Sequence, residues 1–322
     1  MQAVIIAGGK GTRLRPLTER SPKPMLPILD RPFLTWMVER CREAGVTDIL
    51  MNIHYQAAQI ESYFGTGEAW GVQIRYIQEH SPLDTAGAMK LAEPYFSGAP
   101  LIVFNADILT DLDLNALMQA HQDTQAKATL ALARVADPTA FGLVELADPK
   151  NPHSATQPVV AFREKPTAEE AAALGINTIN AGTYILNPEV FLAYEARQPL
   201  SFERTVFPNL LRDQKPVTGL IWAGYWMDLG TPAKYYQGQL DILQGQMPWR
   251  FETSIQKPIP QVWVSPSATI HADAQLAGPS FIGEQVRLGA GAVIPAGTIV
   301  GAHSFIDHPL TPGMYPPGTL VV

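Results

Sequence analysis

The chain has 322 residues, of which 46% are hydrophobic and 16% are charged, and its formal net charge is -7. This composition excludes a disordered or low-complexity chain, and the acidic balance argues against a protein that coats nucleic acid, which needs a basic face. No apolar run approaches the roughly 20 residues of a membrane helix, and the N-terminus lacks the order of a signal peptide. A single cysteine, Cys41, excludes an internal disulfide. We therefore expect a cytoplasmic protein without a nucleic-acid or membrane partner.

Short β-rich apolar runs alternate with helical patterns over the first 124 residues. Strands are predicted at 3–7, 48–52, 73–77 and 101–105, and helices at 33–44, 56–64, 85–95 and 112–124. This alternation predicts parallel strands with crossover helices, as in a doubly wound, Rossmann-like α/β sheet. Ligands of such sheets bind beyond the carboxyl ends of the strands. The loop after the first strand and Asp107 after the fourth both fall there.

From residue 128 the pattern becomes richer in strands. We expect strands at 128–135, 143–146, 159–163, 178–186 and 217–222, which extend the sheet into a mixed one, and a closing helix at 232–244. Residues 1–244 should therefore form one α/β domain. Residues 245–262 carry Pro248, Pro258 and Pro260, a composition that suits an ordered linker.

Aliphatic residues recur every six positions in the last part of the chain. A six-residue period with one inward aliphatic per repeat predicts a short left-handed β-helix of hexapeptide repeats over residues 263–322. Counted at three repeats per turn, this coil has under three turns, so one end should pack on the first domain or on another subunit. The aliphatic positions are Val264, Ile270, Leu276, Ile282, Leu288, Ile294, Val300 and Ile306.

A glycine-rich loop with added cations follows the first strand. It reads AGGKGTRLRPLT at 7–18 and continues as PKPMLP at 22–27. Glycines let the backbone approach a nucleotide and direct N–H groups at phosphate oxygens. It is not a Walker loop, because no Lys-Ser/Thr follows the last glycine, and Leu14 replaces the third glycine of a dinucleotide fingerprint. A stiff loop that carries Arg13 and Lys23 suits an anionic leaving group.

These two motifs resemble the most specific motif of the sugar nucleotidyltransferase (NDP-sugar pyrophosphorylase) family. The resemblance continues through FNAD at 104–107, FREKP at 162–166, NAGTY at 180–184 and WMDLGTP at 226–232, and so covers residues 1–244. The repeat region is similar to that of longer members, such as mannose-1-phosphate guanylyltransferases and ADP-glucose pyrophosphorylases. The resemblance implies that residues 1–244 are a catalytic domain that joins a nucleoside triphosphate to a sugar 1-phosphate and releases pyrophosphate.

The resemblance also implies the catalytic residues and a metal. Arg13 and Lys23 would hold the β- and γ-phosphates, and Lys165 would hold the sugar phosphate. Asp107 and Asp228 would bind Mg²⁺ against the α-phosphate. Because two anions must meet, such a reaction needs charge neutralisation more than covalent help. Two aspartates with a hard, oxygen-seeking cation supply it without a Cys/His site.

Further positions carried over from the family would bind the substrates. Glu164, Asn180 and the backbone at Gly142 would contact the sugar hydroxyls. The nucleotide pocket would be lined by Ala7, Gly8, Gly9, Gly11, Thr12, Gln78, Thr85, Ala86 and Gly87.

One residue departs from the family pattern and bears on the choice of base. The family usually has Leu-Gly-Thr-Ala-Gly where this chain has Leu-Asp-Thr-Ala-Gly at 83–87. Asp84 could accept hydrogen bonds from a guanine edge or point into solvent. Pro82 and Gln78 are similar to the thymidylyl- and uridylyltransferase versions of this loop, whereas NAGTY, WMD and the repeat region are more like the guanylyltransferases. We favour GTP and mannose 1-phosphate, with a glucose-1-phosphate thymidylyl-, uridylyl- or adenylyltransferase as the alternative.

Two other classes of protein remain as alternatives. A silent regulatory subunit would usually have lost a loop cation or a metal carboxylate, and this chain keeps both kinds. A bifunctional acyltransferase could use a histidine of the repeat region (His271, His303 or His308), but the short coil has no long loop to shape an acyl-donor site. We expect the repeat region to assemble a homo-oligomer, because a short β-helix leaves open ends.

Overall fold

The computed structural model describes residues 1–148, 155–164, 167–252 and 254–322. Within these residues, nine strands form one mixed sheet in the order β5-β4-β1-β6-β11-β8-β12-β10-β9. The four strands from β5 to β6 are parallel, and β11 runs antiparallel to β6 and to β8. The strands are β1 (Gln2–Ile6), β4 (Asp48–Ile53), β5 (Gln73–Gln78), β6 (Leu101–Asn105), β8 (Ala128–Arg134), β9 (Gly142–Leu146), β10 (Thr156–Glu164), β11 (Thr178–Leu186) and β12 (Val217–Ile221).

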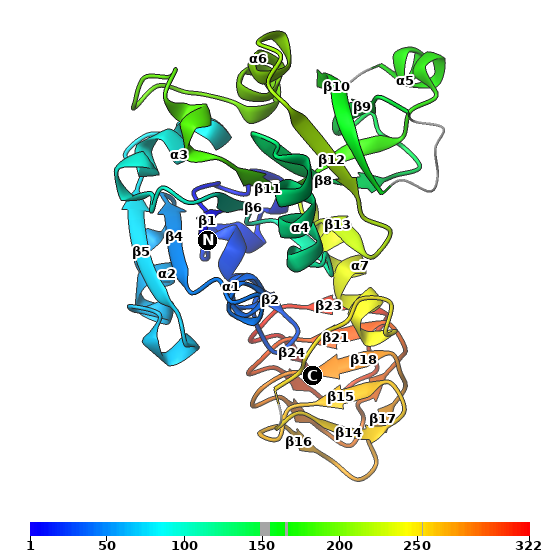
Figure 1. Ribbon diagram of the computed structural model, residues 1–322. Coiled ribbons are helices and arrows are strands. Elements are labelled where there is room, and N and C mark those ends of the chain that lie inside the picture. Colours follow the sequence, from blue (N-terminus) through cyan, green and yellow to red (C-terminus); the bar gives the residue numbers. More distant parts are fainter. Residues whose placement is uncertain (149–154, 165–166, 253) are drawn as a thin grey trace.

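The helices α1 to α7 lie between or beside these strands (Figure 1). All the strands and helices predicted for this part are present, with ends that differ by at most three residues. Several short elements were missed: the helices α5 and α6, the hairpin β2 (Pro27–Ile28) and β3 (Arg31–Pro32), and the pair β7 (Ile108–Thr110) and β13 (Trp226–Asp228). The helices are α1 (Phe33–Glu43), α2 (Ala57–Phe64), α3 (Asp84–Ala92), α4 (Leu114–Thr124), α5 (Ala168–Leu174), α6 (Phe207–Arg212) and α7 (Pro232–Leu243).

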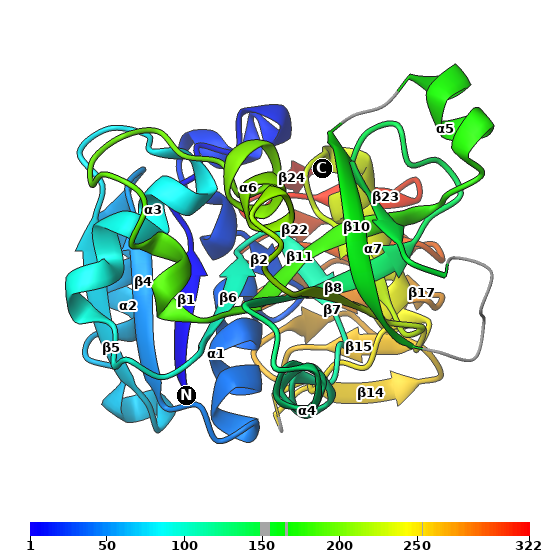
Figure 2. The same ribbon diagram turned by 45° about the horizontal axis from the view of Figure 1, so that its top comes forward.

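Alternate residues of the central strands enter two different cores. Ile5 points to the face covered by α1, α4 and α7, whereas its neighbour Val4 points to the face covered by α3 and α6 (Figure 2). Because successive strand residues face opposite sides, a strand buried on both faces is apolar throughout. This explains why the parallel strands were recognisable as continuous apolar runs. Cys41 on α1 is fully buried, and burial raises the pKa of its thiol to about 12, as suits a structural cysteine.

The C-terminal part, here called the tail (residues 256–322), consists of short strands in three sheets. Strands recur at intervals of 18 residues and pair in parallel, so that Val262 lies beside Ser280 and Ser280 beside Thr298. The in-phase aliphatic residues form the tail's own core. Its strands are β14 (Gln256–Ile259), β15 (Val262–Val264), β16 (Thr269–Ile270), β17 (Gln275–Leu276), β18 (Ser280–Ile282), β19 (Arg287–Leu288), β20 (Val293–Ile294), β21 (Thr298–Val300), β22 (Phe305–Ile306), β23 (Gly313–Tyr315) and β24 (Leu320–Val321).

The tail differs from the sequence expectation at both ends. β14 lies within the expected linker but pairs antiparallel with β15, and so belongs to the first tail sheet. After Ile306, β23 and β24 add a further turn, with Thr298 beside Gly313 and Phe305 beside Leu320. The count of under three turns was too low, because this last turn has 15 residues and leaves the six-residue phase.

One face of the tail packs on the α/β domain. The middle residues of β15, β18, β21 and β23 are Trp263, Phe281, Ile299 and Met314, which lie side by side and point away from the tail's own core. Phe281 and Ile299 are buried in the same cluster as α1 and α7, and the other two pack against it. Figure 1 shows α7 between the sheet and the tail. No helix in the described part of the chain is long and apolar enough to cross a membrane.

The aromatic contact of this face can be tested with a matched pair of substitutions. Phe281→Ala should lower the free energy of unfolding by about 3 kcal/mol, because a phenylalanine that is 2% exposed would leave a cavity between the domain and the tail. Phe305→Ala, in a strand on another tail sheet and 36% exposed, should cost less than about 1 kcal/mol. Urea unfolding of both variants measures the difference. Equal losses would mean that the outward face is not a packed interface.

Candidate active site

A lysine amine stands between two carboxylates at the rim of the sheet. The Lys23 Nζ donates a hydrogen bond of 2.7 Å to the Asp107 Oδ2 and lies 3.8 Å from the Asp228 Oδ1. The side chains of Lys23 and Asp228 are only 11% and 14% exposed, whereas that of Asp107 is 35% exposed. One cation therefore balances two anions in a place that water reaches only from one side.

Three separate segments bring these charges together. Asp107 follows β6 at its carboxyl end, where parallel strands place ligand-binding groups. Asp228 ends β13, which pairs with β7 so that Asp228 lies beside Ile108, and the Leu229 N–H donates to the Asp107 carbonyl at 2.9 Å. Lys23 begins a short 3₁₀ turn, Lys23–Met25, just before the β2–β3 hairpin.

The electrostatics of Asp228 suit a cation. Burial raises the pKa of Asp228, the nearby Asp107 raises it further, and Lys23 and Arg13 oppose the rise. The Asp228 Oδ1 is buried and accepts no hydrogen bond from the residues that the structure describes. A further positive charge beside this oxygen would stabilise the ionised carboxylate against the effects of burial and of the Asp107 charge.

The two carboxylates fit the expected Mg²⁺. Among the described residues, no group of three or more His, Cys, Asp or Glu side chains could hold a metal. Mg²⁺ is commonly held by one or two carboxylates, with phosphates and water as its other ligands. Asp107 and Asp228 would hold such an ion, and it would neutralise charge on the phosphates.

Arg13 approaches the same cluster from the glycine-rich loop. Its Nη2 lies 4.0 Å from the Asp228 Oδ2, and its side chain is 68% exposed, so the guanidinium is open to a ligand. A Cβ at Gly230 would lie 2.7 Å from the Arg13 Nη2, so a larger residue there would displace the guanidinium from this position. Gly11 has a φ of +59°, and its carbonyl accepts the Thr18 hydroxyl. Thr12 begins the turn that carries Arg13. Arg13, Lys23, Asp107 and Asp228 thus lie together, as the resemblance implied.

A buried carboxylate beside the glycine-rich loop was missed from the sequence. Glu79 is 5% exposed, and a Cβ at Gly8 would lie 2.8 Å from its Oε1. Its Oε2 accepts the Leu83 N–H at 3.3 Å. Burial raises the pKa of Glu79, whereas the Leu83 bond and His54 lower it. Glu79 directly follows β5, so the strand-end rule that selected Asp107 could have found it.

The expected nucleotide residues divide into exposed and covered ones. Gly9 and Gln78 are exposed, and Ala7 is buried with its N–H bonded to the Asn52 carbonyl. The N–H groups of Ala86 and Gly87 both donate to the Leu200 carbonyl, and the Thr85 hydroxyl accepts the Phe202 N–H. The amides of Ala86 and Gly87 are thus occupied within the protein.

The Asp84 carboxylate is engaged within the protein, so it does not simply point into solvent, and its contact with guanine stays a prediction. Asp84 has a φ of +61°, a conformation that explains why glycine is usual there. One carboxylate oxygen accepts the Thr85 N–H at 2.8 Å, and the other pairs with Arg204. A partner 120 positions away in the sequence could not be deduced from the loop itself.

A polar network surrounds Asn180 on the expected sugar side. The Asn180 Nδ2 donates to the Tyr184 hydroxyl at 2.7 Å and to the Glu203 Oε1 at 3.1 Å, and its Oδ1 accepts the Gly182 N–H. Glu203 also accepts the Ser201 hydroxyl at 3.0 Å. Glu203 lies in a π-helical turn, η7 (Phe202–Val206), that the sequence did not predict.

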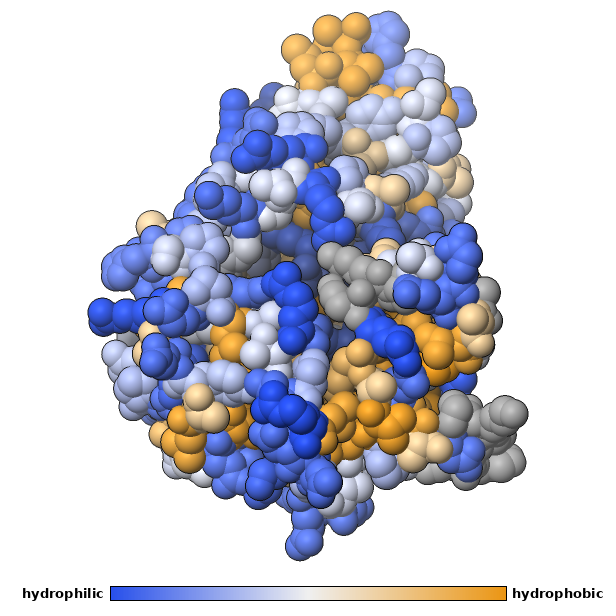
Figure 3. All heavy atoms as spheres, turned by 90° about the horizontal axis from the view of Figure 1, so that it is seen from above, coloured by the Kyte–Doolittle hydropathy of each residue, from blue (hydrophilic) through white to orange (hydrophobic). Residues whose placement is uncertain are grey.

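The backbones of the two remaining expected sugar ligands meet where β9 begins and β10 ends. Gly142 and Glu164 are paired across β9 and β10. Lys165 lies outside the described residues. Figure 3 looks onto the end of the molecule where the parallel strands finish, and hydrophilic residues surround the hollow in the middle of this face.

Comparisons with known proteins agree with this arrangement. The sequence model of the family described as "Nucleotidyl transferase" matches residues 2–245. A mannose-1-phosphate guanylyltransferase of Mycobacterium tuberculosis is 36% identical over 96% of this chain and 83% of its own length. A UTP–glucose-1-phosphate uridylyltransferase of Synechocystis is 31% identical over 95% of this chain and 80% of its own. The crystal structure of HddC from Yersinia pseudotuberculosis complexed with GMP-PN superimposes with a TM-score of 0.61 at 28% identity, covering 75% of this chain and 99% of that one.

The charge balance of the site predicts how the protein responds to loss of its cation. Lys23→Met should lower the free energy of unfolding by about 1–3 kcal/mol at neutral pH, because two neighbouring carboxylates lose their counter-charge. Added Mg²⁺ should raise the melting temperature of this variant more than that of the wild type, since the ion no longer competes with the amine. Differential scanning fluorimetry with Mg²⁺ against Na⁺ at equal ionic strength measures both effects. An identical response of the two proteins would contradict this reading of the cluster.

Proposed function

Because the chain belongs to the nucleotidyl transferase family, we propose that it joins GTP to mannose 1-phosphate and so forms GDP-mannose and pyrophosphate. The chain is a sugar-1-phosphate nucleotidyltransferase. A relative named as a mannose-1-phosphate guanylyltransferase is 36% identical to it over 96% of this chain. The observation that carries the proposal is the cluster of Arg13, Lys23, Asp107 and Asp228 at the carboxyl end of the sheet.

The reaction is a single in-line displacement. An oxygen of the sugar phosphate attacks the α-phosphorus, the bond from this phosphorus to the bridging oxygen breaks, and pyrophosphate leaves with the bonding electrons. The sugar phosphate is already ionised, so no strong general base is needed, and no enzyme-bound intermediate forms. Arg13 and Lys23 neutralise the departing pyrophosphate, and Lys165 holds the sugar phosphate. A bound Mg²⁺ would supply further neutralisation at the α-phosphate.

Lys23 is engaged by both carboxylates of the cluster. Its amine bonds to Asp107 and lies within ion-pair distance of Asp228. A phosphate would compete with the two carboxylates for this amine, and a divalent ion at the carboxylates would ease that competition. Triphosphate and metal therefore support each other's binding at this cluster.

Glu79 is the feature that favours guanine. A carboxylate accepts hydrogen bonds but donates none when ionised, and the Watson–Crick edge of guanine offers two adjacent donors, N1–H and the 2-amino group. Glu79 is buried beside Gly8, which the family resemblance places against the base. The guanine nucleotide bound by HddC is consistent with such a site in this fold. The exposed Gln78 at the end of β5 favours the second candidate, a uridylyl- or thymidylyltransferase that uses glucose 1-phosphate.

The tail supports two further proposals. Its parallel strands at intervals of 18 residues fit three hexapeptide repeats per turn of a left-handed β-helix. Leu320 and Val322 are 67% and 71% exposed at its C-terminal end, which suits a contact between copies in a homo-oligomer whose mass light scattering would give. The cytoplasmic location stays a prediction from the sequence.

The function is tested by a matrix of the four ribonucleoside triphosphates and dTTP against several sugar 1-phosphates, with pyrophosphate release as the readout. GTP with mannose 1-phosphate should give the highest kcat/KM, and release should require both substrates and Mg²⁺. Asp107→Asn and Asp228→Asn should each lower kcat by at least about a hundredfold with the fold intact by circular dichroism, since each removes a carboxylate from the cluster. Activity of either variant near that of the wild type would refute the metal assignment.

The base can be tested at one residue. Glu79→Gln should lower kcat/KM for GTP by about tenfold or more, because the amide presents a donor where guanine has a donor. The same variant should lose little or gain activity with UTP, whose base offers an acceptor beside a donor. Glu61→Gln, an exposed glutamate on α2, is the matched control. An unchanged ratio of GTP to UTP activity would remove Glu79 from base selection.

A further inference from the structure

The hairpin that follows Lys23 is stiff and held at its turn. The segment from Pro22 to Pro32 contains several prolines, which restrict its backbone. It is also held by its own hydrogen bonds, because the Leu26 N–H donates to the Lys23 carbonyl and the Phe33 N–H donates to the Leu26 carbonyl. The turn places Leu29 at a φ of +54°, which is unfavourable for a branched side chain, and Leu29 is nevertheless 7% exposed. A turn of this kind persists only if its surroundings hold it.

The holding groups come from α7, the helix that follows Asp228. The Gln239 Oε1 accepts the Leu29 N–H at 3.0 Å, and the Gln239 Nε2 donates to the Tyr235 carbonyl at 3.2 Å. Gln239 is 2% exposed, so these bonds are shielded from water. One turn earlier on the same helix, the Tyr235 hydroxyl donates to the Pro27 carbonyl. Both hydrogen bonds from α7 are therefore made to the hairpin that follows Lys23.

The tail is in contact with the same groups. The Met314 Sδ lies 3.6 Å from the Gln239 Nε2, and the Tyr236 hydroxyl donates to the Gly297 carbonyl. On the other side of the turn, the Asp30 carboxylate accepts the Trp249 Nε1–H at 3.1 Å and the Glu252 N–H at 2.9 Å. Residues that follow α7 in the chain thus enclose the turn.

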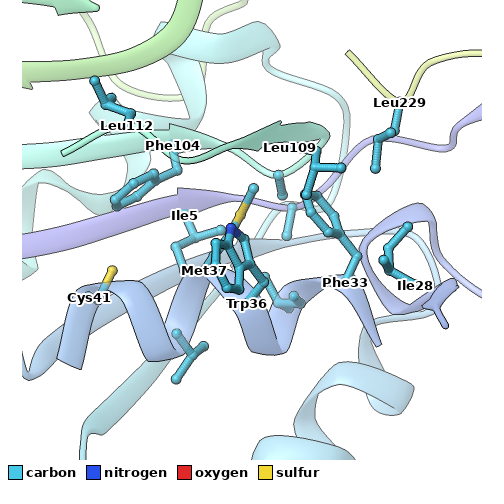
Figure 4. Close-up of a cluster of buried hydrophobic side chains, with 14 of the residues drawn as sticks. Ile5, Ile28, Phe33, Trp36, Met37, Cys41, Phe104, Leu109, Leu112 and Leu229 are labelled. Carbon is cyan, nitrogen blue, oxygen red and sulfur yellow. The ribbon is translucent and has the colours of Figure 1, made fainter. Parts of the chain in front are cut away.

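Figure 4 shows that the hairpin after Lys23 and the residue after Asp228 contribute to the same apolar core. Ile28 of the hairpin and Leu229, the residue after Asp228, lie at the same end of α1 as Phe33 and Leu109. Displacing the hairpin relative to α7 would therefore move Lys23 relative to Asp228.

We propose that Gln239 is a positioning residue, which holds Lys23 in register with Asp107 and Asp228 by fixing the Leu29 turn, and that the tail supports it through Met314. This inference rests on the proposed role of Lys23 toward the triphosphate. It gives the tail a function in each single subunit, separate from any assembly of subunits.

The test compares the full-length Gln239→Met and Gln237→Met variants. Methionine keeps the length of the side chain but removes its amide. Gln237 is on the same helix, is exposed, and donates to the Asp241 Oδ1 at 2.7 Å. Gln239→Met should lower kcat by about tenfold or more and raise the KM for the triphosphate, because small displacements of a charge-neutralising group slow the reaction strongly. The KM for the sugar 1-phosphate should stay within about twofold of the wild type, and Gln237→Met should match the wild type.

A second pair of variants tests the tail. Met314→Ala should shift kcat and the triphosphate KM in the same direction as Gln239→Met, and Phe305→Ala, on another tail sheet and 36% exposed, should not. This pair also decides the matter if Gln239→Met does not fold. The assays use whichever substrate pair the wild type turns over, so that a wrong assignment of the substrates does not count against the role of Gln239. Calorimetry of triphosphate binding gives a second readout that does not depend on turnover. Wild-type kinetics in Gln239→Met, or in Met314→Ala, or equal rises of both KM values, would overturn the proposal.

Discussion

The structure depends on one electrostatic constraint: two carboxylates stand close together in a partly dry place and share one ammonium group. Asp228 is buried, and the charge of Asp107 makes its ionisation harder still. Lys23 offsets both effects from a distance of 2.7 Å to one carboxylate and 3.8 Å to the other. Such a cluster is stable only if three segments, the end of β6, the end of β13 and the turn before β2, are held in register to within a fraction of an ångström. Much of the remaining structure can be understood as the means of holding them.

The same balance explains how the site can receive substrates. A nucleoside triphosphate and a sugar phosphate bring several negative charges, and a site with a fixed excess of positive charge would be difficult to keep folded without them. Here Asp107 and Asp228 carry the counter-charges of Lys23. Metal binding at Asp107 and Asp228 would free Lys23 for the phosphates at the moment when they arrive. The guanidinium of Arg13, which is largely exposed and 4.0 Å from its nearest carboxylate oxygen, requires no such exchange. The two cations therefore differ in how they become available, although the sequence motif presents them as equivalent.

The sequence predicted those parts of the fold and site that depend on local pattern. Apolar runs located the strands of the main sheet, and motif residues located Arg13, Lys23, Asp107 and Asp228, which lie far apart in the chain but close in the structure. What could not be predicted depends on partners distant in sequence. Asp84 is explained by Arg204, in a turn with no periodic pattern, and the last turn of the tail escaped detection because it leaves the six-residue phase. Glu79 was within reach of the strand-end rule, but a single glutamate carries no motif, and its burial beside a glycine is evident only in the structure.

The tail shows how such distant contacts bear on chemistry. The tail's own core needs only the inward aliphatic residues, yet one tail sheet also carries an apolar stripe on its outer side, from Trp263 to Met314, that does not contribute to that core. This stripe packs against α7, whose N-terminal end follows Asp228 and whose buried Gln239 holds the turn after Lys23. Because a hydrogen bond to a buried backbone group is lost at the full desolvation penalty of that group, Gln239 resists displacement more strongly than apolar packing alone would. The outward stripe thus restrains the helix, the helix restrains the turn, and the turn sets the distance between the cation and the carboxylates on which the reaction depends.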